Sequence, residues 1–258
     1  MEPVIYEKDG PLGWLTLNRP EKRNALSLEL MADLQEKLLQ LEQDRDIRVL
    51  IIRGNGPAFC AGHDLTEMAG AHLDFHHFHR LFDVCSQLMQ SLHALPQPVI
   101  AQVHGIATAA GCQLVAACDL AIAETNAQFA TPGVKIGLFC TTPAVPLVRV
   151  IDRRRALDML LSGRFVSAEE AERFGLVNRI VEPEKLARET RDWALELAKC
   201  SRFTLGFGKR TFYRQVDLDE ISAYNYAVNA IAMNCLDADA QEGMKAFLEK
   251  REPIWDKR

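Results

Sequence analysis

The stretch ATAAGCQLVAACD, residues 107–119, decides the fold, because its small residues connect a strand-like segment to an apolar helical segment. The preceding residues 98–105, PVIAQVHG, have the length and apolar content of a buried strand. A helix that starts directly after such a turn points several N–H groups at one spot, where its partial positive charge favours an anionic oxygen. The alternative is tight helix packing through alanine and glycine. The one long polar side chain of the stretch is the amide of Gln113.

Hydrophobic patterns on both sides of this stretch predict an α/β fold. Strands are expected at residues 12–18, 49–54, 98–105 and 119–124, and helices at residues 27–44 and 75–95. Such alternation is typical of crossover connections between neighbouring strands. Beyond about residue 143 the pattern is almost entirely helical, with one short strand expected within residues 176–182. We therefore expect a mixed core at residues 1–200, followed by a helical region at residues 201–258.

The composition excludes several classes of function. The chain has 258 residues, 48% of them hydrophobic, and a net charge of −5, which disfavours nucleic-acid binding. The sequence has no apolar run of membrane-spanning length and no secretory signal at its start. Seven cysteines without CxxC spacing predict reduced thiols and no metal site. We expect a cytoplasmic location, or a mitochondrial one if the protein is eukaryotic and a presequence has been removed.

Two further motifs each have a functional and a structural interpretation. PAFCAGHDLTEM, residues 57–68, follows a predicted strand. Its Gly62 allows the backbone to approach a ligand closely, or else the segment is a loop in which Asp64 caps a helix. QFATPGVKIGLFCTTP, residues 128–143, contains a Pro-Gly turn in an apolar loop. This loop is either the wall of a pocket or a surface loop.

Taken together, these motifs resemble the enoyl-CoA hydratase/isomerase (crotonase) superfamily in order and spacing. The resemblance lies in AFCAGHDL, in the run from HG through AAGCQL to ACDLAIA, and in QFATPGVKIGL. NRPEKRNAL near the start and SAEEAERFGLVNRIV are also similar, so that the likeness covers nearly the whole chain. It implies a spiral of ββα turns and a helical C-terminal region that builds homotrimers or hexamers. It also implies an acyl-CoA thioester as ligand, with no cofactor besides the coenzyme A of the substrate.

The resemblance further implies a set of site residues. The backbone N–H groups of His63 and Ala110 would form an oxyanion hole for the thioester oxygen as it becomes enolate-like. The coenzyme A channel would involve Arg23, Ala25, Ala61, His63, Asp64, Leu65 and Thr66, while Phe247 and Lys250 would reach the ligand of a neighbouring subunit. For Arg23 and Lys250 the alternative is an ordinary solvated charge.

The chain departs from the family pattern at the two positions that carry acid–base chemistry. A hydratase of the family uses two glutamates, and Gln113 and Gly133 stand at their positions here. An amide does not titrate near neutral pH, although Gln113 can still orient a water or bond a ligand, and glycine has no side chain. Ordinary hydratase activity and simple isomerase activity are therefore disfavoured.

Several hypotheses remain open. In the first, the chain is a lyase or isomerase that either uses another base, with His63, His104 and Cys140 as candidates, or needs only the oxyanion hole. In the second, it binds acyl-CoA without turnover, as a regulatory protein would. In the third and most distant, its helical C-terminus recruits another protein and the pocket is vestigial. We expect His104 to point into the core and Cys140 to be an inert apolar thiol.

The segment HLDFHHFHR, residues 72–80, raises a separate question of metal binding. Its His72, His76 and His79 would share one helical face. No carboxylate or cysteine completes the set, so we expect no metal site.

Overall fold

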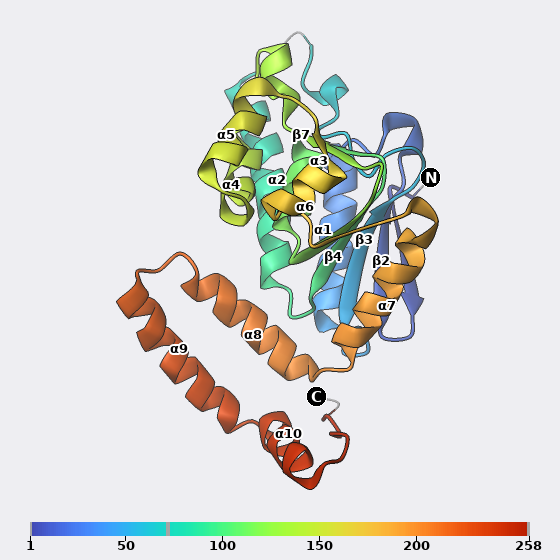
Figure 1. The fold of residues 1–258 in the computed structure, drawn as a ribbon. Helices are drawn as coiled ribbons and strands as arrows, with labels where there is room; N and C mark the ends of the chain where they lie inside the picture. The colour runs from blue at the N-terminus through green and yellow to red at the C-terminus, as the bar shows by residue number, and fades with distance from the viewer. Residues whose placement is uncertain (1, 71–72, 257–258) are drawn as a thin grey trace.

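The computed structural model describes residues 2–70 and 73–256, in which a six-stranded sheet forms the centre of the fold (Figure 1). Its strand order is β1-β2-β3-β4-β6-β9. The strands span Val4–Asp9, Leu12–Leu17, Val49–Gly54, Val99–Val103, Leu120–Glu124 and Arg179–Val181, respectively. Only the β1–β2 pair is antiparallel, and the other neighbours in this sheet run parallel. The predicted α/β class with crossover connections is confirmed.

A second sheet of three short strands leads into the turn before α3, within residues 107–119. It consists of β5 (Ile106–Thr108), β7 (Gln128–Ala130) and β8 (Val166–Ser167), in that order. The sequence did not predict these strands, because runs of two or three residues are too short to show a period. The segment after residue 103 is therefore a strand followed by a helix, and not only a turn.

The helices begin and end largely where the local signals indicate. The Ser27 hydroxyl caps α1 by accepting from the N–H of Leu30, and Gly163 and Gly175 end α5 and α6 in the left-handed conformation. The helices are α1 Leu28–Gln43, α2 Phe75–Ala94, α3 Ala110–Ala117, α4 Thr141–Val150, α5 Arg153–Ser162, α6 Ala168–Phe174, α7 Leu186–Ala198, α8 Arg202–Gln215, α9 Glu220–Cys235 and α10 Ala238–Glu249. Short 3-10 turns span η1 Pro20–Lys22, η2 Leu65–Glu67, η3 Pro132–Ile136 and η4 Pro183–Lys185. Among the described helices, none combines the length and apolar character needed to cross a membrane.

Both faces of the large sheet are covered, which explains why β3 is a continuous apolar run. Leu50 and Ile52 of β3 belong to the core that α1, α2 and α3 complete. Val49 and Ile51 point to the other face and pack with residues of α7. Figure 1 shows α7 on one side of the sheet, with α1 to α3 on the other. A strand buried on both faces has no polar side to alternate with.

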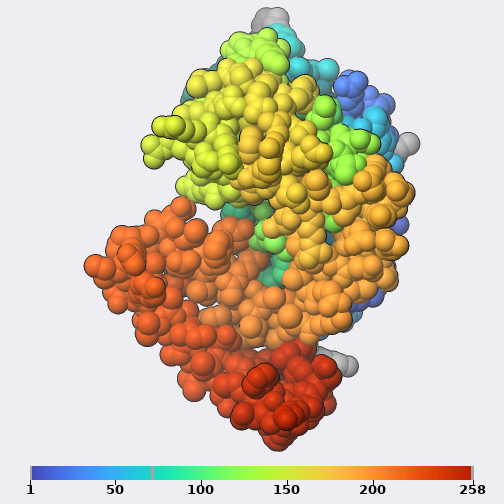
Figure 2. Space-filling view, in the orientation of Figure 1, coloured from blue at the N-terminus to red at the C-terminus, as the bar shows by residue number. Residues whose placement is uncertain are grey.

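The last three helices form an arm that leaves this core. Figure 1 shows α8 and α9 as an antiparallel pair that continues into α10, and Figure 2 shows this C-terminal part projecting from the body. Ala230 is the only buried residue of α9, although the helix is rich in apolar residues. More than half of the surface is exposed at its apolar positions Ile221, Tyr224, Val228, Ile231 and Met233. The apolar character of α9 is therefore not used within one chain.

A buried ion pair fixes the first helix of the arm to the sheet. Lys209 of α8 places its Nζ 2.6 Å from a carboxylate oxygen of Asp119, which directly precedes β6. The same ammonium donates to the carbonyl oxygens of Leu92 and Gln97, and the Tyr213 hydroxyl donates to Asp119 at 2.8 Å. Every donor of the ammonium thus has a partner, so the buried charge is compensated.

Removing this cation is expected to destabilise the whole protein. We expect Lys209→Ala to lower the free energy of unfolding by about 3–5 kcal/mol, because it leaves the Asp119 carboxylate largely buried without its counter-charge. Urea denaturation measures this change. Lys245→Ala is the matched control, since Lys245 is two-thirds exposed and lies 4.0 Å from Glu249; it is expected to change stability by less than about 0.5 kcal/mol. Equal effects of the two substitutions would contradict this role for Lys209.

Candidate functional site

A cavity of about 460 Å³ lies where the three sequence motifs meet. The loop after β3 supplies Ala61, His63 and Leu65, and the start of α3 supplies Ala110. The third motif forms the opposite wall through residues of the range 132–143, so its interpretation as a pocket wall is correct. The lining is mostly apolar. Among the described residues that line it, the titratable side chains are His63, Lys135 and Cys140, and none of these is a carboxylate.

The backbone N–H groups of His63 and Ala110, two residues of the cavity lining, are without an acceptor among the described residues. Leu26 and His63 form an isolated parallel bridge. The Leu26 N–H donates to the Gly62 carbonyl, and the Leu26 carbonyl accepts from the Asp64 N–H. The N–H of His63 therefore faces away from Leu26, and it has no acceptor among the described residues. Ala110 is the first residue of α3, where an N–H has no partner within the helix, and it too has no acceptor in the described part of the chain.

Two glycines allow the segments carrying these donors to approach each other. Gly62 has φ of 101°, and a β-carbon there would lie 2.9 Å from Cβ of Ala109 and 3.1 Å from the carbonyl oxygen of Thr108. A β-carbon on Gly111 would collide with the carbonyl oxygen of Cys60. Hydrogen bonds join the same segments, including one of 3.0 Å from the Thr108 hydroxyl to the Ala61 carbonyl. The relative position of the two free N–H groups is thus fixed by packing.

Ala109 holds the turn in a conformation that normally requires glycine. Its φ is 50° and its ψ is −117°, and it immediately precedes α3 without a side-chain cap. For a residue with a β-carbon this region costs about 1–3 kcal/mol, so the surrounding structure must impose it. The sequence predicts only a small packing residue at this position, because a residue type does not reveal backbone strain.

Relief of this strain is measurable. We expect Ala109→Gly to raise the free energy of unfolding by about 1 kcal/mol, because the lost strain exceeds the greater entropy of glycine in the unfolded chain. Thermal and urea unfolding of the variant and the parent protein test this. Ala194→Gly, in the interior of α7, is the control and is expected to lower stability. Destabilisation by both substitutions would contradict the assignment of strain to Ala109.

The His63 ring is largely buried beside the cavity and is uncharged at neutral pH. It packs edge-on against Phe82 with ring centroids 5.1 Å apart, and neither ring nitrogen has a hydrogen-bond partner. Burial lowers the pKa of His63 from 6.5 to about 4, which a contact with the Leu26 backbone only partly opposes. A base this weak accepts a proton poorly near pH 7. The ring can instead exchange a hydrogen bond with a ligand in the cavity.

The lowered pKa predicts a pH dependence of stability. The unfolded chain binds a proton at His63 more tightly than the native protein does, so stability is highest above pH 6.5 and falls as the pH drops toward 4. The contribution of His63 to this loss of stability is about 3 kcal/mol at most. We expect His63→Leu and His63→Phe to remove it, so that both variants lose less stability than the parent protein between pH 7 and pH 4. Parallel stability curves for all three proteins would show that the ring is not the group responsible.

Gln113 lies one helical turn beyond Ala110 and is almost fully buried. Its side chain lines an adjoining cavity of 560 Å³ that shares Thr142 with the first cavity. The Oε1 atom of its amide is buried and has no hydrogen-bond partner among the described residues. Because a buried amide oxygen without a donor is costly, this position favours a water or a ligand group that donates to it.

Gly133 lines the first cavity, and its surroundings have no room for a side chain. A β-carbon at this position would lie 2.7 Å from the carbonyl oxygen of Leu138 and 2.8 Å from Sγ of Cys140. The N–H of Leu138 donates to the carbonyl of Gly133 at 2.9 Å, which keeps the loop closed on itself. The space that an acid would need here is therefore filled by the backbone of the same loop.

Other residues expected at the site lie around the cavity without lining it. Asp64 is buried, pairs with Arg19 at 3.0 Å and caps η2 through Thr66, so its predicted capping role is confirmed. The Arg19 ion pair and the Thr66 hydrogen bonds lower the pKa of Asp64 against the effect of burial. Arg23 is exposed at the left-handed end of η1, and its backbone carbonyl accepts from the Ala61 N–H. The backbone carbonyl of Ala25 accepts from the Arg19 guanidinium. This turn thus supports the loop that carries His63.

The remaining candidates lie outside the cavity. Phe247 and Lys250 are on α10 and its C-terminal end, and Phe247 is 83% exposed. A ring nitrogen of His104 contacts the Gly56 carbonyl at 2.9 Å, and the residue is partly exposed, so the expectation that it points into the core is wrong. His104 is not among the residues that line the cavity. Burial raises the pKa of the Cys140 thiol, as expected for an inert residue. His72 lies outside the described residues, and the described part of the chain contains no metal-binding cluster.

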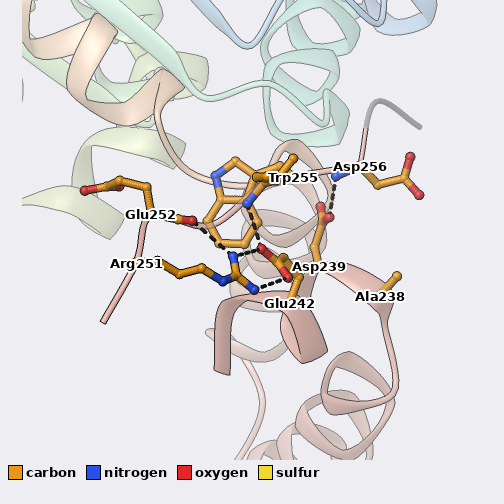
Figure 3. Close-up of a pocket in the computed structure, with 8 residues that line it drawn as sticks. Ala238, Asp239, Glu242, Arg251, Glu252, Trp255 and Asp256 are labelled. Carbon is orange, nitrogen blue, oxygen red and sulfur yellow. Dashed lines mark hydrogen bonds and ion pairs between the residues drawn. The ribbon is translucent and has the colours of Figure 1, made fainter. Parts of the chain in front are cut away.

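A larger cavity of 700 Å³ is a structural feature of the C-terminal arm (Figure 3). Its lining groups bond one another. Arg251 pairs with Glu242 through two contacts, of 2.6 and 3.0 Å, and Asp239 accepts the backbone N–H of Asp256. The Trp255 indole donates to the Lys199 carbonyl at 2.6 Å. These contacts hold the tail after α10 against the α7–α8 junction.

Comparison with known proteins identifies the family of the chain. A family model described as enoyl-CoA hydratase/isomerase matches residues 7–258. Rat enoyl-CoA hydratase domain-containing protein 3, a mitochondrial protein, is 45% identical over 242 residues, which are 93% of this chain and 80% of the relative. A Thermus thermophilus protein named putative enoyl-CoA hydratase is 35% identical over 256 residues, covering 97% of this chain and 99% of the relative.

Solved structures show the same fold. The crystal structure of human enoyl Coenzyme A hydratase domain-containing protein 3 aligns with a TM-score of 0.95 at 42% identity, over 98% of this chain and 100% of that one. A crystal structure of an enoyl-CoA hydratase from Mycobacterium smegmatis has a TM-score of 0.95 and 45% identity, over 98% of each chain. The chain therefore belongs to the enoyl-CoA hydratase/isomerase family and has the crotonase fold. Curated relatives of the domain-containing protein 3 group are 44–45% identical to it.

Proposed function

We propose that the chain binds acyl-CoA thioesters in the 460 Å³ cavity and holds the thioester oxygen with the N–H groups of His63 and Ala110. The observation that carries this proposal is that the acceptor-free N–H groups of His63 and Ala110 lie on two closely packed segments of one mainly apolar cavity. Backbone donors fixed in a site with little water stabilise negative charge on such an oxygen as it becomes enolate-like. The side chains at positions 63 and 110 do not enter this interaction.

The coenzyme A part of the ligand would lie at the rim of the cavity. Leu65 is about half exposed, and Lys135 is the exposed cation of the lining. Arg23 and Lys135 are suited to the phosphates of coenzyme A, while Ala25, Ala61 and Thr66 shape the loop beside them. The amide of Gln113 would bond a water or a donor group of the acyl chain, which its unpartnered oxygen favours.

Ordinary hydration of an enoyl thioester is not the reaction we propose. Hydration in this family needs two acids, and here one position is an amide and the other has no space for a side chain. His63 is a weak base because burial lowers its pKa to about 4, and the Cys140 thiol has a raised pKa. Lyase or isomerase chemistry that depends on the oxyanion hole alone stays compatible with this site.

A non-catalytic acyl-CoA-binding or regulatory role is the second candidate. The observation that favours it is the lack of a carboxylate among the described lining residues, together with the weak basicity of His63. Both candidates predict binding of an acyl-CoA, and only the first predicts turnover of some thioester. A protein-recruiting scaffold with a vestigial pocket predicts neither.

We further propose a homotrimer or hexamer assembled through the arm. The exposed apolar residues of α9 and α10, which include Phe247 at 83% and Leu248 at 80% exposure, support this assembly. Burying them against another copy would remove apolar surface from water. In such an assembly Phe247 and Lys250 would reach the ligand of a neighbouring subunit.

Binding of matched coenzyme A derivatives tests the contact with the thioester oxygen. We expect butyryl-CoA to bind at least about tenfold more tightly than S-butyl-CoA, which lacks the carbonyl, because the thioether leaves both N–H groups unpaired. Isothermal titration calorimetry measures both affinities. Equal affinities would contradict the oxyanion contact, and no binding of either would contradict the proposal that the cavity takes acyl-CoA.

The absence of hydratase chemistry has its own test. With crotonyl-CoA we expect kcat far below the value of about 1 s⁻¹ that marks the low end of ordinary enzymes. Gln113→Glu alone is expected not to restore hydration, because position 133 still supplies no second acid. The loss of enoyl-thioester absorbance follows the reaction. A parent rate above about 1 s⁻¹ would mean that another group supplies the proton transfer.

A further inference from the structure

A smaller cavity, of about 270 Å³, is lined by three arginines and lies away from the site described above. It lies between the loop after α1 and the start of α8, and it shares no residue with the 460 Å³ cavity. Arg45 comes from the loop, and Arg202 and Arg210 come from α8. Because α8 is one of the few elements that connect the arm to the core, these residues meet only in the folded chain.

These three arginines lack the carboxylate partners that eight other arginines of the described chain have. None of them has a carboxylate within 4.0 Å in the described chain. By contrast, Arg19, Arg164 and Arg191 each form an ion pair at 3.0 Å or less. The Nε of Arg202 is buried and has no hydrogen-bond partner. A buried guanidinium N–H without an acceptor is costly, so this atom favours an acceptor from outside the chain.

The charges around Arg202 add to this imbalance. Burial lowers the pKa of Arg202, and the neighbouring Arg45 and Arg48 lower it further, while Asp44 acts in the opposite direction. Asp44 is already engaged with Lys8, at 3.5 Å. Glu42 also lines the cavity, but it lies beyond ion-pair distance of the arginines. Local positive charge therefore exceeds local negative charge in a protein whose net charge is −5.

We propose that this cavity binds a phosphate-type oxyanion between Arg45, Arg202 and Arg210. A tetrahedral dianion accepts several charge-assisted hydrogen bonds at once, and the planar guanidinium fork matches its oxygen geometry. It would give the Arg202 Nε its missing acceptor and offset the repulsion that Arg45 and Arg48 exert on Arg202. The group is either free inorganic phosphate or the phosphate of a small ester, since the cavity is too small for a larger ligand to enter whole.

Calorimetric titration of the full-length protein with inorganic phosphate tests the proposal, and adenosine monophosphate is the ester probe. We expect phosphate to bind and Arg45→Ala/Arg210→Ala to weaken it at least about tenfold, because each lost guanidinium removes charge-assisted hydrogen bonds. Both substituted residues are exposed, so the fold is expected to persist. Arg202→Lys, which keeps the charge and removes the fork, is expected to weaken binding as well. Tighter binding of the monophosphate ester with the same loss in the variants would identify an ester as the source.

The control is Arg154→Ala, which removes an exposed arginine whose side chain has no ion pair in the described structure. It is expected to leave phosphate affinity unchanged. Saturation with butyryl-CoA is also expected to leave it unchanged, because the two cavities are separate. No binding of either probe to the parent protein would overturn the proposal. The same would follow if the double variant and the Arg154→Ala control bound phosphate as the parent does.

Discussion

The close approach of two chain segments at Gly62 is the constraint on which the site depends. Only a residue without a β-carbon lets the loop after β3 lie against Thr108 and Ala109, and Gly62 takes a left-handed φ to do so. This contact sets the N–H groups of His63 and Ala110 on one cavity. This geometry requires a strained backbone at Ala109. Hydrogen bonds between β5 and the loop hold that backbone in place.

Gln113 and Gly133 stand where the resemblance places the family's two glutamates, and their surroundings differ in kind. At Gln113 only the chemistry of the side chain changes, since a buried polar group with hydrogen-bonding capacity remains on the same helix. At Gly133 the space itself has been taken by the Leu138 carbonyl and the Cys140 sulfur. Restoring an acid there would require the loop to move. No carboxylate lines the 460 Å³ cavity among the described residues, and we propose that the site relies on fixed backbone donors.

The sequence predicted the long elements and singled out the three motifs that line one cavity, but not the contacts within that cavity. The helix capped by Ser27 and the glycine ends at Gly163 and Gly175 follow from local signals, and so they were predictable. The strands β5 and β7 are each three residues long and show no period. The crowding at Gly133 depends on residues that meet only when the loop folds back, and the low pKa of His63 depends on burial against Phe82. Neither leaves a mark in the local pattern.

The most direct test of the central claim is isotope-edited infrared spectroscopy of butyryl-CoA labelled with ¹³C at its carbonyl. If the N–H groups of His63 and Ala110 hold the thioester oxygen, they polarise the carbonyl bond, and its stretching band moves to lower frequency when the ligand binds. The same band in unbound butyryl-CoA in buffer is the reference. A bound ligand whose carbonyl band stays at the reference frequency, or moves to higher frequency, would contradict the account.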